Sequence, residues 1–184
     1  MRTARQSIER LDSWYPSLFV EPHAVAAVAV LSDYSESPAN FNLQSENVRE
    51  LEEFGGEMRL DLSWPLNLEA KGERLRATMQ RSPLVELAAT AVALVVARRV
   101  LNLGRLEVTG YGDRADFRSP RRRAVLEVSG TEVADEFLRR HREKVTQAAE
   151  NPFGWDAYVV VCLFSARGHR IRLSHHKCSE GSHE

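Results

Sequence analysis

The sequence has few of the features that define several common protein classes. It has only two cysteines among 184 residues, Cys162 and Cys178, so a disulfide framework is excluded and a cytoplasmic location is expected. Its most apolar segment, residues 84–100, carries Glu86 and is short for a bilayer span, so we expect no membrane association. Residues 1–6 are followed by no apolar stretch as long as a signal peptide needs, so none is expected.

Several catalytic and binding motifs are missing as well. The chain has no Ser-His-Asp pattern, no Gly-rich phosphate loop, and no aromatic residues interleaved as in RNA-binding motifs. Four possible zinc ligands near the C-terminus have a spacing that matches no closed zinc site. They are His175, His176, Cys178 and His183.

The composition and charge distribution indicate a globular domain with a modest basic excess in its second half. Hydrophobic residues make up 43% of the chain and charged residues 28%, which is enough to bury a core. The net charge of −1 divides into −5 for residues 1–92 and +4 for residues 93–184. A basic half favours an anionic partner such as DNA or RNA, although a solvated surface often shows a similar excess.

Residues 1–81 are expected to form an N-terminal extension of short helices and strands. The expected elements are a helix over 3–13, a strand from His23 to Leu31, a loop over 33–45, a helix over 45–54 and a strand over 57–66. The charged residues 67–81 are expected to mark a boundary.

The second half predicts an α/β fold, or more broadly a mixed α+β fold, with a central mixed sheet flanked by helices. Residues 82–175 form its expected core, and residues 176–184 a polar tail. The expected elements are a central helix over 84–101 started by Ser82 and Pro83, strands over 105–111, 114–117 and 124–128, a helix over 132–149 capped by Thr131, and strands over 156–164 and 169–173.

Two carboxylates in the predicted hairpin are the main candidate site. Asp116 opens one strand, and Glu127 lies inside the next strand. Two carboxylates on neighbouring strands repel each other unless a cation or a proton lies between them, and hard oxygen ligands suit Mg²⁺ or Mn²⁺. In the alternative interpretation, Leu126 and Val128 face the core and Glu127 faces water.

This order of elements and residues resembles the PD-(D/E)XK nuclease superfamily, which has the restriction-endonuclease-like fold. The resemblance covers residues 82–175 and implies that Asp116 is the strand aspartate, Glu127 the acid of the (D/E)-x-K motif and Glu86 the acid of the first helix. It implies Mg²⁺- or Mn²⁺-dependent cleavage of nucleic-acid phosphodiesters, with Asp116 and Glu127 as metal ligands. A bacterial defence or nucleic-acid-processing system is the expected setting, by analogy.

The chain departs from the motif at its lysine, which is replaced by Ser129. A serine hydroxyl carries no charge to stabilise an anionic transition state. Some members of the superfamily take this lysine from the following helix, where Lys144 shares a face with Phe137 and His141. Alternatively, Lys144 belongs to a solvated helix face, and Glu86 to the exposed side of its helix.

Four arginines are candidate contacts for nucleic-acid phosphates. They are Arg121, Arg122 and Arg123 in the hairpin turn, and Arg140 in the charged run over 139–144. A second hypothesis follows from the missing motif lysine: a catalytically inactive nuclease-fold subunit that binds nucleic acid or protein. A protein partner or a homo-oligomer is then expected, with residues 1–81 as the contact surface.

Overall fold

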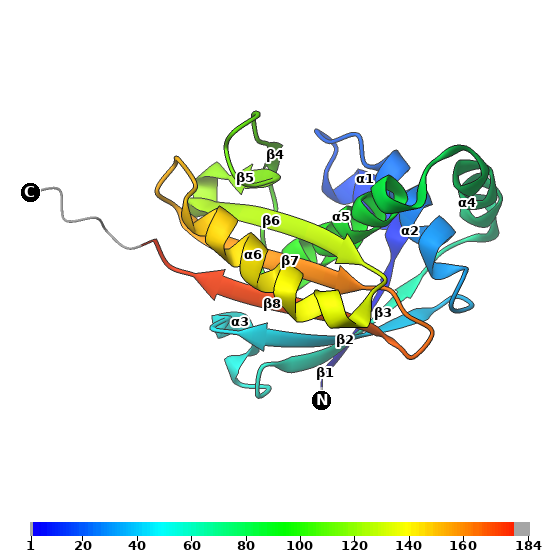
Figure 1. The fold of residues 1–184 in the computed structure, drawn as a ribbon, viewed down its shortest axis with the longest axis horizontal. Coiled ribbons are helices and arrows are strands. Elements are labelled where there is room, and N and C mark those ends of the chain that lie inside the picture. The colour runs from blue at the N-terminus through cyan, green and yellow to red at the C-terminus, as the bar shows by residue number, and fades with distance from the viewer. Residues whose placement is uncertain (1, 179–184) are drawn as a thin grey trace, which may run out of the picture.

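The computed structural model describes residues 2–178, which form one eight-stranded mixed sheet with helices on both faces (Figure 1). The strand order is β1-β3-β2-β8-β7-β6-β5-β4. The β1/β3, β2/β8 and β6/β7 pairs are parallel, and the other neighbours are antiparallel. The mixed sheet flanked by helices, expected from the sequence, is confirmed.

The elements alternate along the chain. The first part contains β1 Arg2–Ser7, α1 Leu11–Trp14, α2 Glu21–Leu31, β2 Ala39–Glu46, α3 Arg49–Glu52, β3 Glu57–Ser63 and α4 Leu66–Thr78. The second part contains α5 Arg81–Arg99, β4 Glu107–Val108, β5 Phe117–Ser119, β6 Ala124–Thr131, α6 Phe137–Ala149, β7 Asp156–Leu163 and β8 His169–His176. The two parts share the sheet because β2 pairs with β8.

Helices cover the two faces of the sheet unequally. On one face, α5 lies over β6 and β7 with α2 packed beside it, and α1 and α4 pack around these two helices (Figure 1). On the other face, α6 covers mainly β6 and β7 and buries a smaller apolar cluster. The strands β1 to β3 present exposed polar side chains on this second face, among them Arg5, Asn42 and Gln44.

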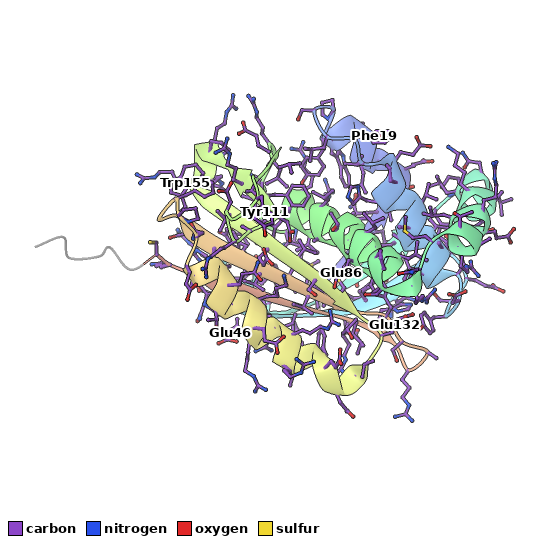
Figure 2. All side chains as sticks on the ribbon, turned by 45° about the horizontal axis from the view of Figure 1, so that its top comes forward. Phe19, Glu46, Glu86, Tyr111, Glu132 and Trp155 are labelled. Atoms are coloured by element: carbon purple, nitrogen blue, oxygen red, sulfur yellow. The ribbon has the colours of Figure 1, made fainter. Side chains whose placement is uncertain are left out.

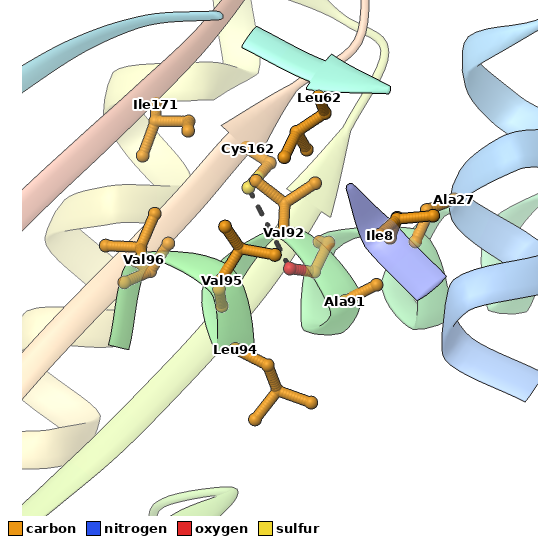
Figure 3. Packing of buried hydrophobic residues seen from close by; sticks show 14 of the residues in the cluster. Ile8, Ala27, Leu62, Ala91, Val92, Leu94, Val95, Val96, Cys162 and Ile171 are labelled. Carbon is orange, nitrogen blue, oxygen red and sulfur yellow. Dashed lines mark hydrogen bonds between the residues drawn. The ribbon is translucent and has the colours of Figure 1, made fainter. Parts of the chain in front are cut away.

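The contact between α5 and the sheet is close because small residues meet there. Val92 and Val95 of α5 face Cys162 of β7, whose thiol donates a hydrogen bond to the Ala89 carbonyl at 3.9 Å (Figure 3). Gly130 of β6 lies against the same helix, where an added Cβ would stand 2.6 Å from the Val85 carbonyl oxygen. Within residues 2–178, no helix has the length and apolar character needed to cross a bilayer.

The strand expected from His23 to Leu31 is wrong, because this segment forms the helix α2. Residues 24–31 are all buried between α4, α5 and the sheet, so the helix has no polar face to give a 3.6-residue period. A short apolar run without a period does not distinguish a strand from a buried helix. The alanines of this run favour the helix, and Pro22 is well placed in its first turn.

Three other expectations for the first part were also wrong. The helix expected over 3–13 begins instead as β1, which pairs with β3 far along the chain, and only its second half is helical, as a 3₁₀ turn followed by α1. The loop expected over 33–45 contains β2, with Phe41 buried between the exposed Asn40 and Asn42. The charged boundary expected over 67–81 is mostly the helix α4. The helix expected over 45–54 is shortened to α3, and the strand over 57–66 is close to its observed position, at β3.

The second part follows the expected order, with shifted ends. The strand at 105–111 is reduced to β4, and α5 begins before Ser82, with Gln80 as its N-cap. Arg81 fixes this first turn, because its guanidinium donates to Glu132 at 2.8 Å and to Asp33 at 2.6 Å. Thr131 ends β6 instead of capping a helix at 132, and α6 starts at Phe137.

The close contact at Gly130 predicts a large cost for an added methyl group. We expect Gly130→Ala to lower the free energy of unfolding by about 1–3 kcal/mol, because backbone of α5 would have to move. Gly104→Ala is the matched control, since its Cβ would meet only the end of the Arg98 side chain. Urea unfolding of both variants measures the difference, and equal stabilities would contradict the packing described here.

Candidate active site on β6

The site is built where β6 extends beyond its shorter neighbour β5. The pairing covers only residues 117–119 of β5 and 124–126 of β6, so later N–H groups on this edge have no strand partner. Two carboxylates supply the hydrogen-bond acceptors that a longer β5 would otherwise provide. Asp116 Oδ2 accepts from the Val128 N–H at 2.7 Å, and Glu86 Oε2 accepts from the Gly130 N–H at 2.9 Å. The side chains of two distant segments therefore meet along one strand edge.

Glu127 lies on the face of β6 that α6 covers, and its side chain is 1% exposed. The alternative in which Glu127 faces water is therefore wrong, although Leu126 and Val128 do face the core. The Lys144 ammonium donates to Glu127 Oε1 and, at 3.2 Å, to Gln147 Oε1. The other oxygen, Oε2, is buried and has no hydrogen-bond partner among the described residues. A cation or a proton bound to this oxygen would offset the cost of burying it.

Burial and neighbouring carboxylates raise the pKa values of both carboxyl groups: Asp116 and Glu86 act on Glu127, and Glu86 acts on Asp116. Burial raises the pKa of Glu127 to about 7, the Asp116 charge adds to this, and Lys144 opposes it. Burial also raises the pKa of Asp116, whereas the Val128 N–H and the Lys144 charge lower it. Without a cation, the site therefore tends to hold a proton near neutral pH.

A second set of contacts joins α5 and α6 to β6. Arg140 donates to Glu86 Oε1 at 3.1 Å and to the Gly130 carbonyl at 3.1 Å. Ser129, at the motif's lysine position, donates its hydroxyl to Glu86 Oε1 at 3.2 Å. Glu86 thus lies between α5 and β6 and not on a free helix surface (Figure 2). Its carboxylate binds protein donors on both oxygens.

The structure brings together four of the predicted residues, namely Glu86, Asp116, Glu127 and Lys144. The three-arginine run is at the other end of β6, in the turn over 120–123, and does not reach this site. Sequence reasoning missed the contact between Arg140 and Glu86. The signal was present, because Arg140 is one helical turn before Lys144 and must share its face.

A cavity of about 380 Å³ opens beside Asp116 on the α5 side of the sheet. Phe19, Thr90, Val108 and Phe117 contribute to its walls together with Asp116. Phe19 is 77% exposed at the outer margin of the molecule (Figure 2). The cavity gives a ligand a partly aromatic route to one of the two carboxylates.

The donor set can be compared with the needs of a metal ion. Among residues 2–178, no group of three or more His, Cys, Asp and Glu side chains is arranged to hold one. Asp116 and Glu127 offer a pair of hard oxygen donors, and the buried Glu127 Oε2 lacks a partner, which fits Mg²⁺ or Mn²⁺ completed by water and phosphate.

The zinc alternative gains no support from the C-terminal histidines. His175 contacts Asp156 at 3.0 Å, and His176 contacts Ser174 at 2.8 Å. His183 lies outside the described residues.

The pKa of Glu127 predicts a pH-dependent stability. Its pKa of about 7 in the folded protein exceeds the usual 4.5. The contribution of protonated Glu127 to the free energy of unfolding is therefore fully present below pH 4.5 and is lost as pH rises through 7. In EDTA, between about pH 5 and pH 8, the free energy of unfolding should fall by about 2 kcal/mol more in the wild type than in Glu127→Gln.

Urea unfolding at several pH values measures this difference. Glu143→Gln, an exposed change on the same helix α6, is the control and should follow the wild type. Parallel pH curves for the wild type and Glu127→Gln would contradict the raised pKa.

The chain was also compared with known proteins. No protein-family model, no curated protein and no solved structure matches it. The site is therefore characterised by its own geometry: the buried Glu127 carboxylate paired with Lys144, the exposed Asp116 carboxylate beside it, and a third carboxylate held by an arginine and two β6 groups.

Proposed function

We propose that the protein is a divalent-metal-dependent nuclease-like domain that hydrolyses nucleic-acid phosphodiesters. The observation that carries the proposal is the buried Glu127 carboxylate, which has one oxygen on Lys144 and one without a partner, beside Asp116. A buried carboxylate oxygen that lacks a hydrogen bond destabilises a fold, so its presence in a strand favours a functional role over a structural one.

The order of elements supports the same proposal. The helix α5, the antiparallel strands β4 to β6, the helix α6 and the parallel strand β7 follow the order of the PD-(D/E)XK core. Ser129 remains a departure from the motif. Lys144 offers a replacement, because its ammonium lies on the same face of β6 as the motif side chains.

Each side chain has a distinct proposed task. Asp116 and Glu127 would hold Mg²⁺ or Mn²⁺, which supplies Lewis-acid polarisation of a phosphate oxygen and a bound water of lowered pKa. Lys144 places a positive charge beside Glu127, where it stabilises negative charge that develops on the phosphate. Glu86, held by Arg140 and Ser129, fixes the edge of β6 and keeps Asp116 and Glu127 in register.

The cavity beside Asp116 supports a nucleic-acid substrate. Its walls include the exposed Phe19, whose aromatic ring provides a stacking surface for a base. The net charge of +4 in residues 93–184 favours the approach of a polyanion.

A second candidate function is an inactive nuclease-fold module that binds nucleic acid or protein. Two observations favour it. Asp116 and Glu86 already accept hydrogen bonds from backbone N–H groups, which is a sufficient structural role for both. Ser129 also donates to Glu86, so the motif's lysine position is used for packing.

Activity assays test the first function. We expect cleavage of single- or double-stranded DNA or RNA with Mg²⁺ or Mn²⁺, and none in EDTA. Asp116→Asn, Glu127→Gln and Lys144→Ala should each lower the rate about 100-fold or more, because each removes a charge at the reaction centre. Arg139→Ala, on the exposed side of α6, is the control and should keep wild-type activity.

Equal cleavage by the wild type and the carboxylate variants would contradict the proposed nuclease function, since a contaminant would then explain the activity. No cleavage of any of these substrates by a folded wild-type protein would favour the inactive module.

Calorimetric titration with Mn²⁺ separates the two functions without a substrate. For the enzyme we expect binding that disappears in Asp116→Asn and Glu127→Gln, together with proton release near neutral pH as the metal replaces the proton on Glu127. Glu46→Gln, an exposed acid on β2, is the control for nonspecific binding. A wild type that binds no Mn²⁺ supports the inactive module.

A further inference from the structure

A second cavity, of about 340 Å³, lies at the far end of β6 from the carboxylates. It is enclosed by the C-terminal end of α5, the loop that follows this helix, and the turn between β5 and β6. Its lining residues are Arg98, Asn102, Gly104, Arg105, Ser119, Arg121 and Arg122. Three chain segments therefore contribute arginines to one hollow.

The positive charge of this cavity is only partly balanced. Arg105 has Glu107 as a partner at 3.5 Å, but the same carboxylate also binds Arg118 at 3.2 Å. In residues 2–178, no carboxylate lies within ion-pair distance of Arg98 or Arg121. Gathered guanidinium groups repel one another, so an anion that entered the cavity would relieve this repulsion.

Local structure directs particular arginines into the cavity. An added Cβ at Gly104 would stand 2.8 Å from Arg98 Nη1, so the missing side chain lets this guanidinium lie against the loop. Arg122 donates to the Leu101 carbonyl at 3.5 Å, which links the β5–β6 turn to the end of α5. Arg123, the third residue of the run, is not part of the lining. The run is thus divided between a cavity wall and the outer surface.

The ligand class follows from the donors. A planar guanidinium presents paired N–H groups that match the oxygens of a phosphate, and several guanidiniums together favour a phosphoryl anion over a single carboxylate. The volume is several times that of a water molecule, about 30 Å³, so a phosphate with an attached sugar has room.

The position of the cavity relates it to the carboxylate site. Ser119, on its wall, is three residues along the chain from Asp116, which is about 10 Å in an extended strand. Stacked nucleotides advance by about 3.4 Å, so about three nucleotides separate the two positions. A strand whose scissile bond lies at Asp116 would thus place a nearby phosphate in the cavity.

We propose that the cavity lined by Arg98, Arg105, Arg121 and Arg122 is a phosphate-binding site that anchors a nucleic-acid strand a few nucleotides from the carboxylates. The link to a strand rests on the proposed nuclease function, whereas phosphate binding itself does not. The same chemistry would also bind a free nucleotide or inorganic phosphate, so the test separates these sources.

The test measures binding in EDTA, so that cleavage does not interfere. A fluorescent single-stranded oligonucleotide is titrated with full-length protein, followed by competition with inorganic phosphate and with a nucleoside monophosphate. We expect Arg98→Gln/Arg121→Gln to weaken binding about tenfold or more and to lower the slope of log affinity against log salt by about 1 to 2. Arg123→Gln removes a neighbouring charge outside the cavity and should change affinity less than about threefold.

A third variant keeps the test valid if the double variant is poorly folded. Gly104→Ala retains every charge but displaces the Arg98 guanidinium, and should weaken binding more than Arg123→Gln does. Binding in EDTA needs neither metal nor cleavage, so a wild type that binds the oligonucleotide but does not cleave it with Mg²⁺ contradicts only the nuclease proposal. Cavity variants that bind it as the wild type does contradict only this one.

Competition between phosphate and oligonucleotide supports one shared site on a strand, and phosphate binding without oligonucleotide binding supports a free small ligand. Equal losses in Arg123→Gln and the cavity variants would overturn the proposal, because general surface charge would then explain binding. No binding of either ligand by the wild type would overturn it as well.

Discussion

The length difference between β5 and β6 is the constraint on which the candidate site depends. Beyond the short β5, the N–H groups of Val128 and Gly130 need acceptors, and buried backbone donors are rarely left without one. Asp116 and Glu86 supply the acceptors, which draws two carboxylates to the strand that also carries Glu127. A requirement of the backbone thus concentrates negative charge at one place. Lys144 and Arg140, from α6, are the cations that balance it.

The second part of the chain could be predicted well because its elements are determined by neighbours in sequence. The strand at Asp156–Leu163 and the long helix α5 have continuous apolar patterns, and Lys144 follows Phe137 at a spacing that turns both toward the sheet. The face of Glu127 was harder to predict. Alternation along β6 places Glu127 on the opposite face from Leu126 and Val128. That α6 buries this opposite face depends on tertiary packing, which the local sequence does not show.

The first part was predicted poorly for the converse reason. The strand β1 owes its conformation to parallel pairing with β3, 56 residues later, and no local pattern indicates that partner. The helix α2 is buried all round, so its sequence lacks the polar stripe by which helices are recognised. In β2, by contrast, the alternation of Phe41 and Leu43 with asparagines was available, but turn-forming residues masked it.

The pairing of β2 with β8 has a consequence for how the chain folds. The strands β1, β3 and β2 join the rest of the sheet only through β8, which is the last strand of the described chain. During synthesis, the edge of β2 stays unpaired until β8 has been made, because Phe41 pairs with His169. Such distant pairing closes slowly and leaves an open strand edge in the meantime. Nascent chains that stop before β8 should therefore be the aggregation-prone species.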